Sequence, residues 1–137
     1  MLSKEIKNVI DVLRERYVNN LTPPSLTIYK QPAYRGCEDN KCSIGCLIDD
    51  STYKRKFEEC DVLTLLDRYP YIVSSLQSRG LYPLEICSRF NEFLYDVQLW
   101  HDLWYVAHYL KVSKEEVATS LNKLQSKWEV LCRNPID

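Results

Sequence analysis

Glycine is scarce in this chain: among its 137 residues only Gly36, Gly45 and Gly80 are glycines. A phosphate-binding loop needs several glycines close together, so a glycine-rich nucleotide site is excluded. An excess of positive charge is also lacking, because the formal net charge is −1. Domains that hold nucleic acid by general electrostatic attraction are usually basic, so direct nucleic-acid binding is not expected.

Long apolar runs are missing too, and no stretch approaches the roughly 20 residues that span a bilayer. The first residues, MLSKEIKNVIDVL, carry charges inside their apolar pattern and lack a small-residue cleavage site. They predict an amphipathic helix rather than a signal peptide. We therefore expect a cytoplasmic protein without membrane association, whose six cysteines are reduced.

The composition is that of a folded domain, with 45% apolar and 27% charged residues. The length suits one domain over residues 1–137. No motif for a cofactor is present, so none is expected. The patterns below predict a mainly α (α+β) fold, with four to six helices around a long central helix and a small antiparallel hairpin sheet.

Apolar residues at helical spacing locate the helices. A first helix is predicted over about 4–18, with Ser3 as its cap and a stripe formed by Ile6, Val9, Ile10, Leu13 and Tyr17. Shorter helices are expected over 53–60, near 62–66 and over 71–78, where Gly80 gives a natural stop.

The longest periodic segment runs from Leu84 to Leu110 without an internal glycine or proline, and we expect it to be the central helix. Its stripe comprises Ile86, Phe90, Phe93, Leu94, Val97, Trp104 and Leu110. Ser113 and Glu116 then form a capping box before a last amphipathic helix over 114–132.

The stretch 33–50, AYRGCEDNKCSIGCLIDD, carries the clearest hairpin signal. Residues 33–35 and 42–44 flank a turn-forming segment, and 26–29 is β-branched and aromatic. Two or three short strands are therefore predicted, and such a small sheet must pack on helices. We expect this cysteine-bearing hairpin to be clamped against the central helix.

Four cysteines near the hairpin are candidate zinc ligands: Cys37, Cys42, Cys46 and Cys60. Four thiolates can close a tetrahedral zinc site. The C-x4-C-x3-C spacing differs from the C-x2-C pair with which structural zinc sites usually begin. The alternative is that Cys46 and Cys60 are small core residues, as free cysteines often are.

A second candidate site combines Cys42 with His101 and Asp102. An imidazole near a thiol can lower the pKa of the thiol and carry its proton, and a carboxylate can orient the imidazole. Neighbouring residues on a helix point about 100° apart, so His101 and Asp102 cannot both face Cys42. In the alternative, His101 hydrogen-bonds the hairpin backbone and pins the hairpin to the helix.

Ten tyrosines are a third feature, because tyrosine is favoured at protein interfaces. Those in connectors and turns are candidate partner-binding residues: Tyr29, Tyr34, Tyr53, Tyr69, Tyr71 and Tyr82. The alternative is that they are half-buried side chains that cover the ends of loops.

Two stretches resemble a family of small, mostly uncharacterised phage and prophage proteins. Residues 34–36 (YRG) and 41–49 (KCSIGCLID) are similar to its pattern YRG…KCAIG-x-LIPD, and 97–102 (VQLWHD) is similar to its helical motif LQ-x-x-HD. Ser43 stands where the family often has alanine, and Asp49 where it often has proline. The matching positions are Cys42, Gly45, Asp49, His101 and Asp102.

This resemblance implies a viral accessory protein in a bacterial cytoplasm. Phage proteins of this size commonly bind and block a host or defence protein, and an anti-CRISPR inhibitor is one concrete form. Two other hypotheses remain: a cysteine-dependent hydrolase or transferase using Cys42 and His101, and a zinc-stabilised interaction module. Both a monomer and a homo-oligomer are compatible with the sequence.

Overall fold

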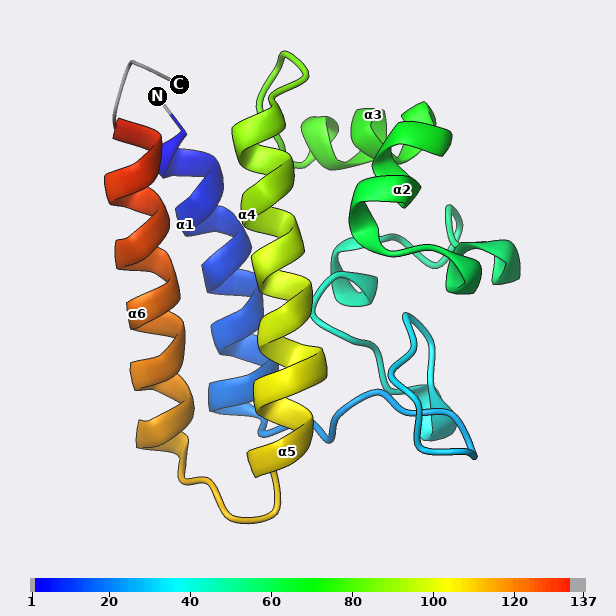
Figure 1. The fold of residues 1–137 in the computed structure, drawn as a ribbon, viewed down its shortest axis with the longest axis vertical. Helices are drawn as coiled ribbons and strands as arrows, with labels where there is room; N and C mark the ends of the chain where they lie inside the picture. The colour runs from blue at the N-terminus through cyan, green and yellow to red at the C-terminus, as the bar shows by residue number, and fades with distance from the viewer. Residues whose placement is uncertain (1, 134–137) are drawn as a thin grey trace.

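A computed structural model describes residues 2–133 and shows a mainly helical protein (Figure 1). Three long helices lie side by side: α1 (Ser3–Leu13), α4 (Ser88–Leu99) and α6 (Lys114–Arg133). The shorter α2 (Val62–Arg68) and α3 (Pro70–Ser78), with the irregular segment 20–60, lie on the other side of α4 from α6. The buried side chains of these parts form one continuous core.

The predicted first helix is confirmed, with a change at each end. All five residues of its apolar stripe are fully buried. Ser3 is the first helical residue rather than the cap, because Leu2 occupies the cap position. At its other end, α1 continues without a break into a π-helical segment, η1 (Arg14–Asn19), which carries the buried Tyr17.

The long central helix is also present but shorter than predicted. It consists of α4, a π-helical segment η5 (Trp100–Tyr105) and α5 (Val106–His108). Leu84 and Ile86 precede it in an exposed connector, which the Gln77 amide holds by donating to the carbonyls of Pro83 and Leu84. The prediction that Ile86 and Leu110 belong to the buried stripe is therefore wrong, since Leu110 is exposed as well.

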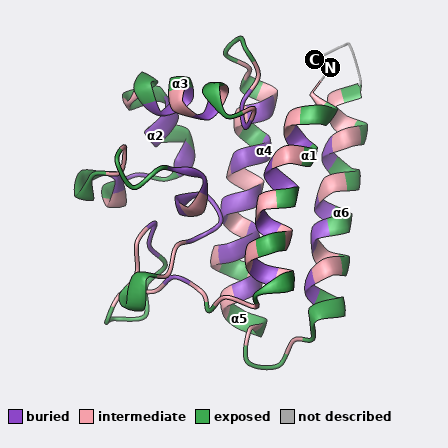
Figure 2. Cartoon of the chain, turned by 180° about the vertical axis from the view of Figure 1, so that it is seen from behind, coloured by how far each residue is buried: buried purple, intermediate pink, exposed green. Residues whose placement is uncertain are grey.

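The last helix, α6, follows the sequence pattern closely. The Ser113 hydroxyl accepts from the Glu116 backbone N–H, and the Glu116 carboxylate accepts from the Ser113 N–H, so the capping box is confirmed. Its buried residues are Val117, Leu121, Leu124 and Trp128, and the helix packs mainly on α1 and η1 and to a smaller extent on α4. Figure 2 shows this inward-facing stripe on each of the three long helices.

The short helices are partly as predicted. Asp61 caps α2 by accepting from the Thr64 N–H, and Gly80, with φ of +72°, follows α3. The segment expected as helix over 53–60 forms only a 3₁₀ helix, η4 (Arg55–Glu59). Its hydrogen bonds span three residues, as from Cys60 N–H to the Phe57 carbonyl. Phe57 is buried, while the Glu58 carboxylate accepts from the backbone N–H groups of Tyr34 and Arg35.

The predicted hairpin sheet is wrong: within residues 2–133 the structure has no strand. Two isolated antiparallel bridges stand in its place, Leu26 with Pro32 and Arg35 with Lys41. Between and after them lie the 3₁₀ turns η2 (Cys37–Asp39) and η3 (Gly45–Leu47). A ladder does not extend because side chains bind the backbone N–H groups that it would need, as His101 and Glu58 do.

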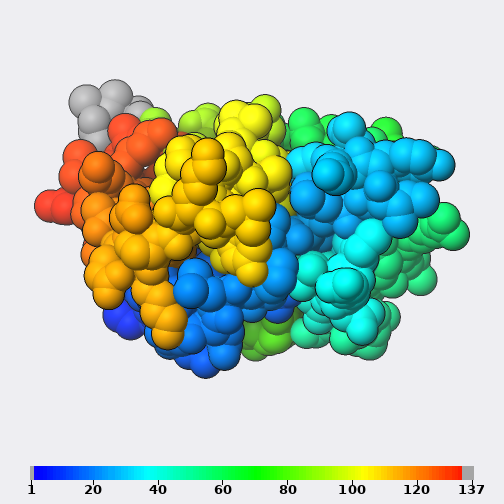
Figure 3. Space-filling model, turned by 90° about the horizontal axis from the view of Figure 1, so that it is seen from below, coloured from blue at the N-terminus to red at the C-terminus, as the bar shows by residue number. Residues whose placement is uncertain are grey.

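The cysteine-bearing segment does lie against the central helix, as expected, and the view from below shows the blue and cyan part of the chain directly beside the yellow end of that helix (Figure 3). The Ser43 hydroxyl donates to the Val97 carbonyl at 2.7 Å, and the Gln98 side-chain amide donates to the Tyr34 hydroxyl at 3.1 Å. Ser43 is fully buried, so these bonds are made inside the protein. No helix among the described residues has the length and apolarity needed to cross a membrane.

Candidate functional site

His101 is the centre of the region that the sequence singles out. The π-helical segment η5 carries its side chain, which is fully buried. Its Nε2 lies 3.0 Å from the Ser25 nitrogen, and its Nδ1 lies 2.7 Å from Asp102 Oδ1. A backbone N–H can only donate, so Nε2 must be the acceptor. The imidazole proton therefore sits on Nδ1 and is donated to the Asp102 carboxylate.

Ser25 links His101 to the neighbouring loops by hydrogen bonds. Its side chain is fully buried, and its hydroxyl lies 2.6 Å from the Ala33 carbonyl oxygen and 3.1 Å from that of Asn40. The Ser25 carbonyl accepts from the Ala33 N–H at 3.1 Å. Through Ser25, His101 thus holds the base of a tight loop over 25–33, which we call the finger loop.

Hydrogen bonds also define the far end of the finger loop. The Lys30 N–H donates to the Thr27 carbonyl, and the Thr27 N–H to the Gln31 carbonyl. The Thr27 hydroxyl oxygen accepts from the N–H groups of Tyr29 and Gln31. The tip residues, Ile28 and Tyr29, are 76% and 79% exposed. The loop therefore presents two apolar side chains to solvent on an internally bonded turn.

A second turn, which begins at Gly36, packs beside the finger loop, and Gly45 lies close to the backbone that precedes this turn. The Gly36 N–H donates to the Asn40 carbonyl, and the Cys37 N–H to the Leu26 carbonyl. A Cβ on Gly36 would lie 2.6 Å from the Leu26 nitrogen, and one on Gly45 only 2.2 Å from the Tyr34 carbonyl oxygen. Neither glycine can therefore carry a side chain without moving the backbone.

Glu58 binds the strand-like segment between these turns. Its carboxylate accepts from the backbone N–H groups of Tyr34 and Arg35 and from the Tyr53 hydroxyl. The Arg35 guanidinium lies over the Tyr53 ring at 4.5 Å and donates to the Gly45 and Ile48 carbonyls. The whole segment is therefore held by side chains rather than by a sheet.

Cys42 does not have the surroundings of a nucleophile. Its side chain is 2% exposed, and its sulfur accepts from the Gly45 N–H at 3.2 Å. Burial raises the pKa of the Cys42 thiol far above its usual value, and the nearby Asp102 charge adds to the rise. Among the described residues no hydrogen bond joins this sulfur to His101, whose two ring nitrogens have other partners.

Cys42 and Asp102 do meet at a cavity of about 350 Å³, to whose wall His101 does not belong. Tyr34, Cys60 and Gln98 also line it. Gln98 donates to the Tyr34 hydroxyl, which donates to the Cys60 carbonyl, so these polar groups bind one another. The Cys42 thiol is buried with a raised pKa, and both imidazole nitrogens have other partners, so the contacts of the described residues provide no base for Cys42.

The four candidate zinc ligands are not assembled. Cys37 is exposed, Cys46 is partly buried, and Cys42 and Cys60 are buried. Residues 2–133 contain no group of three histidine, cysteine, aspartate or glutamate side chains placed to hold a metal ion. Burial also raises the pKa of Cys46, to about 11. The remaining cysteines, Cys87 and Cys132, are partly buried against the core.

The candidate partner-binding tyrosines divide into three groups. Tyr34 and Tyr82 are 4% and 1% exposed, so the prediction that a partner reaches them is wrong. Both hydroxyls donate hydrogen bonds within the protein: that of Tyr82 to the Asn91 side chain at 2.6 Å, and that of Tyr34 to the Cys60 carbonyl. Tyr53 and Tyr69 are partly buried against Phe57. Tyr29 and Tyr71 are exposed.

Comparison of the chain with protein-family models, with curated proteins and with solved structures gives no match. The candidate site is therefore defined by its geometry alone. Sequence reasoning pointed to Tyr29 but missed Ile28 beside it and Ser25 beneath it. The adjacent apolar pair in a proline-bounded turn, IY within PPSLTIYKQP, is the signal that could have found the tip.

Proposed function

We propose that this protein acts by binding another protein through the tip of the finger loop, as an inhibitor or modulator of a host or bacterial defence protein. The observation that carries the proposal is the exposure of Ile28 and Tyr29 on a turn held at both ends. An anti-CRISPR inhibitor is one form of such a protein, acting in the bacterial cytoplasm. The resemblance to phage proteins supports this class.

The rigidity of the tip favours binding. Ordering a loop on association lowers affinity, and a loop that is already ordered avoids that loss. Tyrosine brings a large contact area with few rotatable bonds, and aromatic anchors dominate many interfaces. The internal bonds of Thr27 and the clamp from His101 order the finger loop before any partner arrives.

The enzymatic alternative is less well supported, because it needs an ionised Cys42 and a free imidazole. The zinc alternative needs clustered thiolates. Neither arrangement is found among the described residues. The binding proposal needs only an accessible and ordered surface.

The experiment is a pull-down from bacterial lysate, followed by titration of the recovered protein with purified variants. Tyr29→Ala is expected to weaken binding at least about tenfold, and Ile28→Ser with Tyr29→Ser to abolish it. Leu110→Ser is the matched control, because Leu110 is 91% exposed at the end of the central helix. The absence of a stoichiometric partner, or equal binding by the double variant, would overturn the proposal.

A second assay tests whether the partner is a component of a bacterial defence system. Cells with an active defence system are infected by a sensitive phage while they express the protein. The wild-type chain is expected to restore plaque formation if the partner is a defence component, whereas the double tip variant is not. Unchanged plaque counts together with a recovered partner would place that partner among other host proteins.

A further inference from the structure

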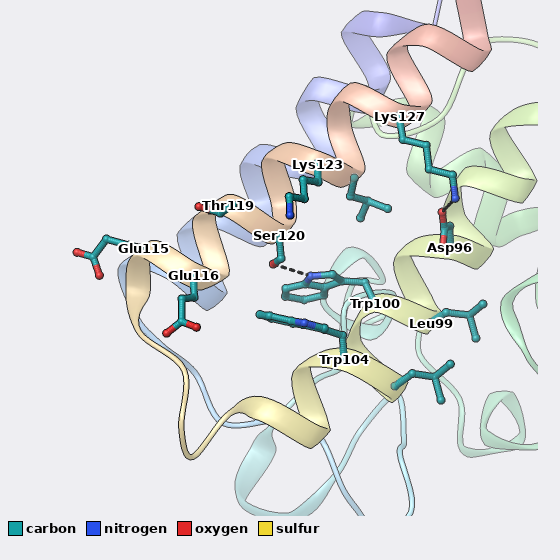
Figure 4. Close-up of a pocket in the computed structure, with 12 residues that line it drawn as sticks. Asp96, Leu99, Trp100, Trp104, Glu115, Glu116, Thr119, Ser120, Lys123 and Lys127 are labelled. Atoms are coloured by element: carbon teal, nitrogen blue, oxygen red, sulfur yellow. Dashed lines mark hydrogen bonds and ion pairs between the residues drawn. The ribbon is translucent and has the colours of Figure 1, made fainter.

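An apolar groove lies between the central helix and α6, on the far side of α4 from the finger loop (Figures 1 and 4). It has a volume of about 760 Å³. Its apolar surface comes from Leu99, Trp100, Leu103, Trp104 and Leu124. Leu103 is 68% exposed and Trp104 is partly exposed, so the groove is open to solvent.

The groove exists because α6 packs mainly on α1 and η1 and only in part on α4. The three long helices thus occupy three corners of a bundle and leave the fourth corner open. Few links cross it: the Trp100 indole N–H donates to the Ser120 hydroxyl at 3.0 Å, and Asp96 binds Lys127 and the Trp128 indole. A fourth helix at this corner would cover the exposed apolar side chains.

The π-helical segment η5 shapes the floor of the groove. Trp100 and Trp104 stack with ring centres 5.9 Å apart and planes 24° apart. Trp104 stacks in turn on His108 at 5.0 Å. Figure 4 shows the two indole rings lying one below the other between the helices, with Ser120 above them. Such π-helical insertions occur often at functional sites.

The two ends of the groove differ in charge. Glu115 and Glu116 stand at the end where α6 begins, whereas Lys123 and Lys127 stand further along it (Figure 4). Asp96 neutralises Lys127. A helix carries partial positive charge at its N-terminus and partial negative charge at its C-terminus. The charges therefore favour an occupant that runs parallel to α6, with its N-terminus at the glutamates.

The groove is also elongated. A neighbouring cavity of about 730 Å³ shares Thr119, Lys123 and Lys127 with it and continues along α6 to Val130 and Leu131. From Glu115 to Leu131 the helix rises about 24 Å. A strip of this length suits several turns of helix, with apolar side chains at the spacing i, i+3, i+4 and i+7.

We propose that this groove binds an amphipathic α-helix of a partner protein, with basic residues in its N-terminal half and acidic residues in its C-terminal half. The helix completes a four-helix bundle with α1, α4 and α6. This surface is separate from the finger loop, and the proposal does not depend on the function proposed for the tip.

The probe is a displayed library of helical peptides about 17 residues long, a length that matches the strip. Apolar positions are fixed at helical spacing, and every other position is randomised between lysine and glutamate. Selection against the full chain is expected to enrich peptides with lysine in the first half and glutamate in the second. A synthetic peptide with the two halves exchanged is expected to bind at least tenfold more weakly, measured by tryptophan fluorescence.

Variants of the chain complete the test. Leu103→Asp is expected to abolish peptide binding, while Leu110→Asp, at an exposed leucine outside the groove, leaves binding unchanged. Lys123→Glu is expected to remove the preference for glutamate in the second half. Tyr29→Ala is expected to bind the peptide normally, which separates this result from a failure of the tip proposal.

Three outcomes would overturn the proposal. The first is that no peptide binds the wild-type chain better than the Leu103→Asp variant, with both folded by circular dichroism. The second is that enriched peptides show no order of charge. The third is that the wild-type chain self-associates in analytical sedimentation and that Leu103→Asp abolishes this association. That result would show that the groove binds a second copy of the chain.

Discussion

The Nε2 atom of His101 accepts a hydrogen bond from the backbone N–H of Ser25, a residue 76 positions earlier in the chain. Both side chains are fully buried. One hydrogen bond thus ties the central helix to the base of the finger loop. His101 therefore positions the finger loop, whose tip carries the exposed Ile28 and Tyr29.

Replacing His101 tests this role. His101→Ala leaves the buried Ser25 N–H without a partner and opens a cavity, so we expect the free energy of unfolding to fall by about 2–4 kcal/mol. Amide hydrogen exchange over the finger loop should accelerate more than exchange in α6. His101→Gln keeps an acceptor on a side chain of similar reach, and we expect it to restore part of the loss. Urea denaturation and hydrogen exchange measure these effects.

His108 provides the control, since it lies on the same helix and is exposed. Its Nδ1 lies 2.7 Å from the Trp104 carbonyl oxygen, within its own helix. We expect His108→Ala to change stability by no more than about 0.5 kcal/mol. Equal losses for the two histidines, or unchanged exchange in the finger loop of His101→Ala, would contradict the clamp.

Thiol labelling tests the surroundings of Cys42. A thiolate is the reactive form, and the raised pKa and burial of Cys42 keep it neutral and covered. We expect a disulfide reagent at pH 8 to label the exposed Cys37 at least about 100-fold faster than Cys42, whose labelling requires opening of the fold. Mass spectrometry of digested samples gives the two rates. Labelling of Cys42 as fast as Cys37 would revive the cysteine-dependent enzyme.

Local periodicity explains what could be predicted from the sequence. The stripe of α1 and the capping box of α6 depend on residues three or four positions apart, so they are visible in the sequence itself. The capping atoms of Ser113 and Glu116 lie as the pattern predicts.

Long-range contacts explain what could not be predicted. The sheet predicted near Ala33–Arg35 does not form because Glu58, more than twenty residues later, takes two of its N–H groups. The pairing of His101 with Ser25 has no local signal either. Trp100 and Trp104 fit a helical stripe, but the groove that they line depends on where α6 packs.

Alkaline pH is expected to destabilise the protein through its buried thiol. The fold holds Cys42 neutral, while the unfolded chain ionises this thiol near its ordinary pKa of about 8.5. The unfolded state then binds fewer protons, so the free energy of unfolding falls as the pH rises above that value. Between pH 8 and pH 10 the wild-type chain should lose about 1–2 kcal/mol more than Cys42→Ala.

Urea denaturation at both pH values measures this difference. The exposed Cys37 supplies the matched variant, and Cys37→Ala should follow the wild-type pH dependence. Burial also raises the pKa of Tyr34, but Tyr34 is present in the wild type and in both variants. It therefore contributes equally to the pH dependence of all three proteins. Parallel losses in wild type and Cys42→Ala would show that the thiol is not held neutral by the fold.

Gly45 permits the sharpest test of the backbone packing. A Cβ at this position would lie 2.2 Å from the Tyr34 carbonyl oxygen and 3.0 Å from its carbon, both parts of the backbone. No rotamer can relieve that clash, so Gly45→Ala must push apart two segments that are held by Arg35 and Glu58. We expect a loss of at least about 3 kcal/mol in unfolding free energy, or failure to fold.

Gly80→Ala separates this steric effect from the general cost of replacing glycine. Gly80 has φ of +72°, and its added Cβ would lie 3.2 Å from the Asn8 amide nitrogen, the end of a flexible side chain. The left-handed backbone alone costs about 1–2 kcal/mol for alanine, so Gly80→Ala should fold with a modest loss. Thermal and urea unfolding rank the two variants. If Gly45→Ala proved as stable as Gly80→Ala, the close approach of residues 34 and 45 would be wrong, and with it the packing that supports the finger loop.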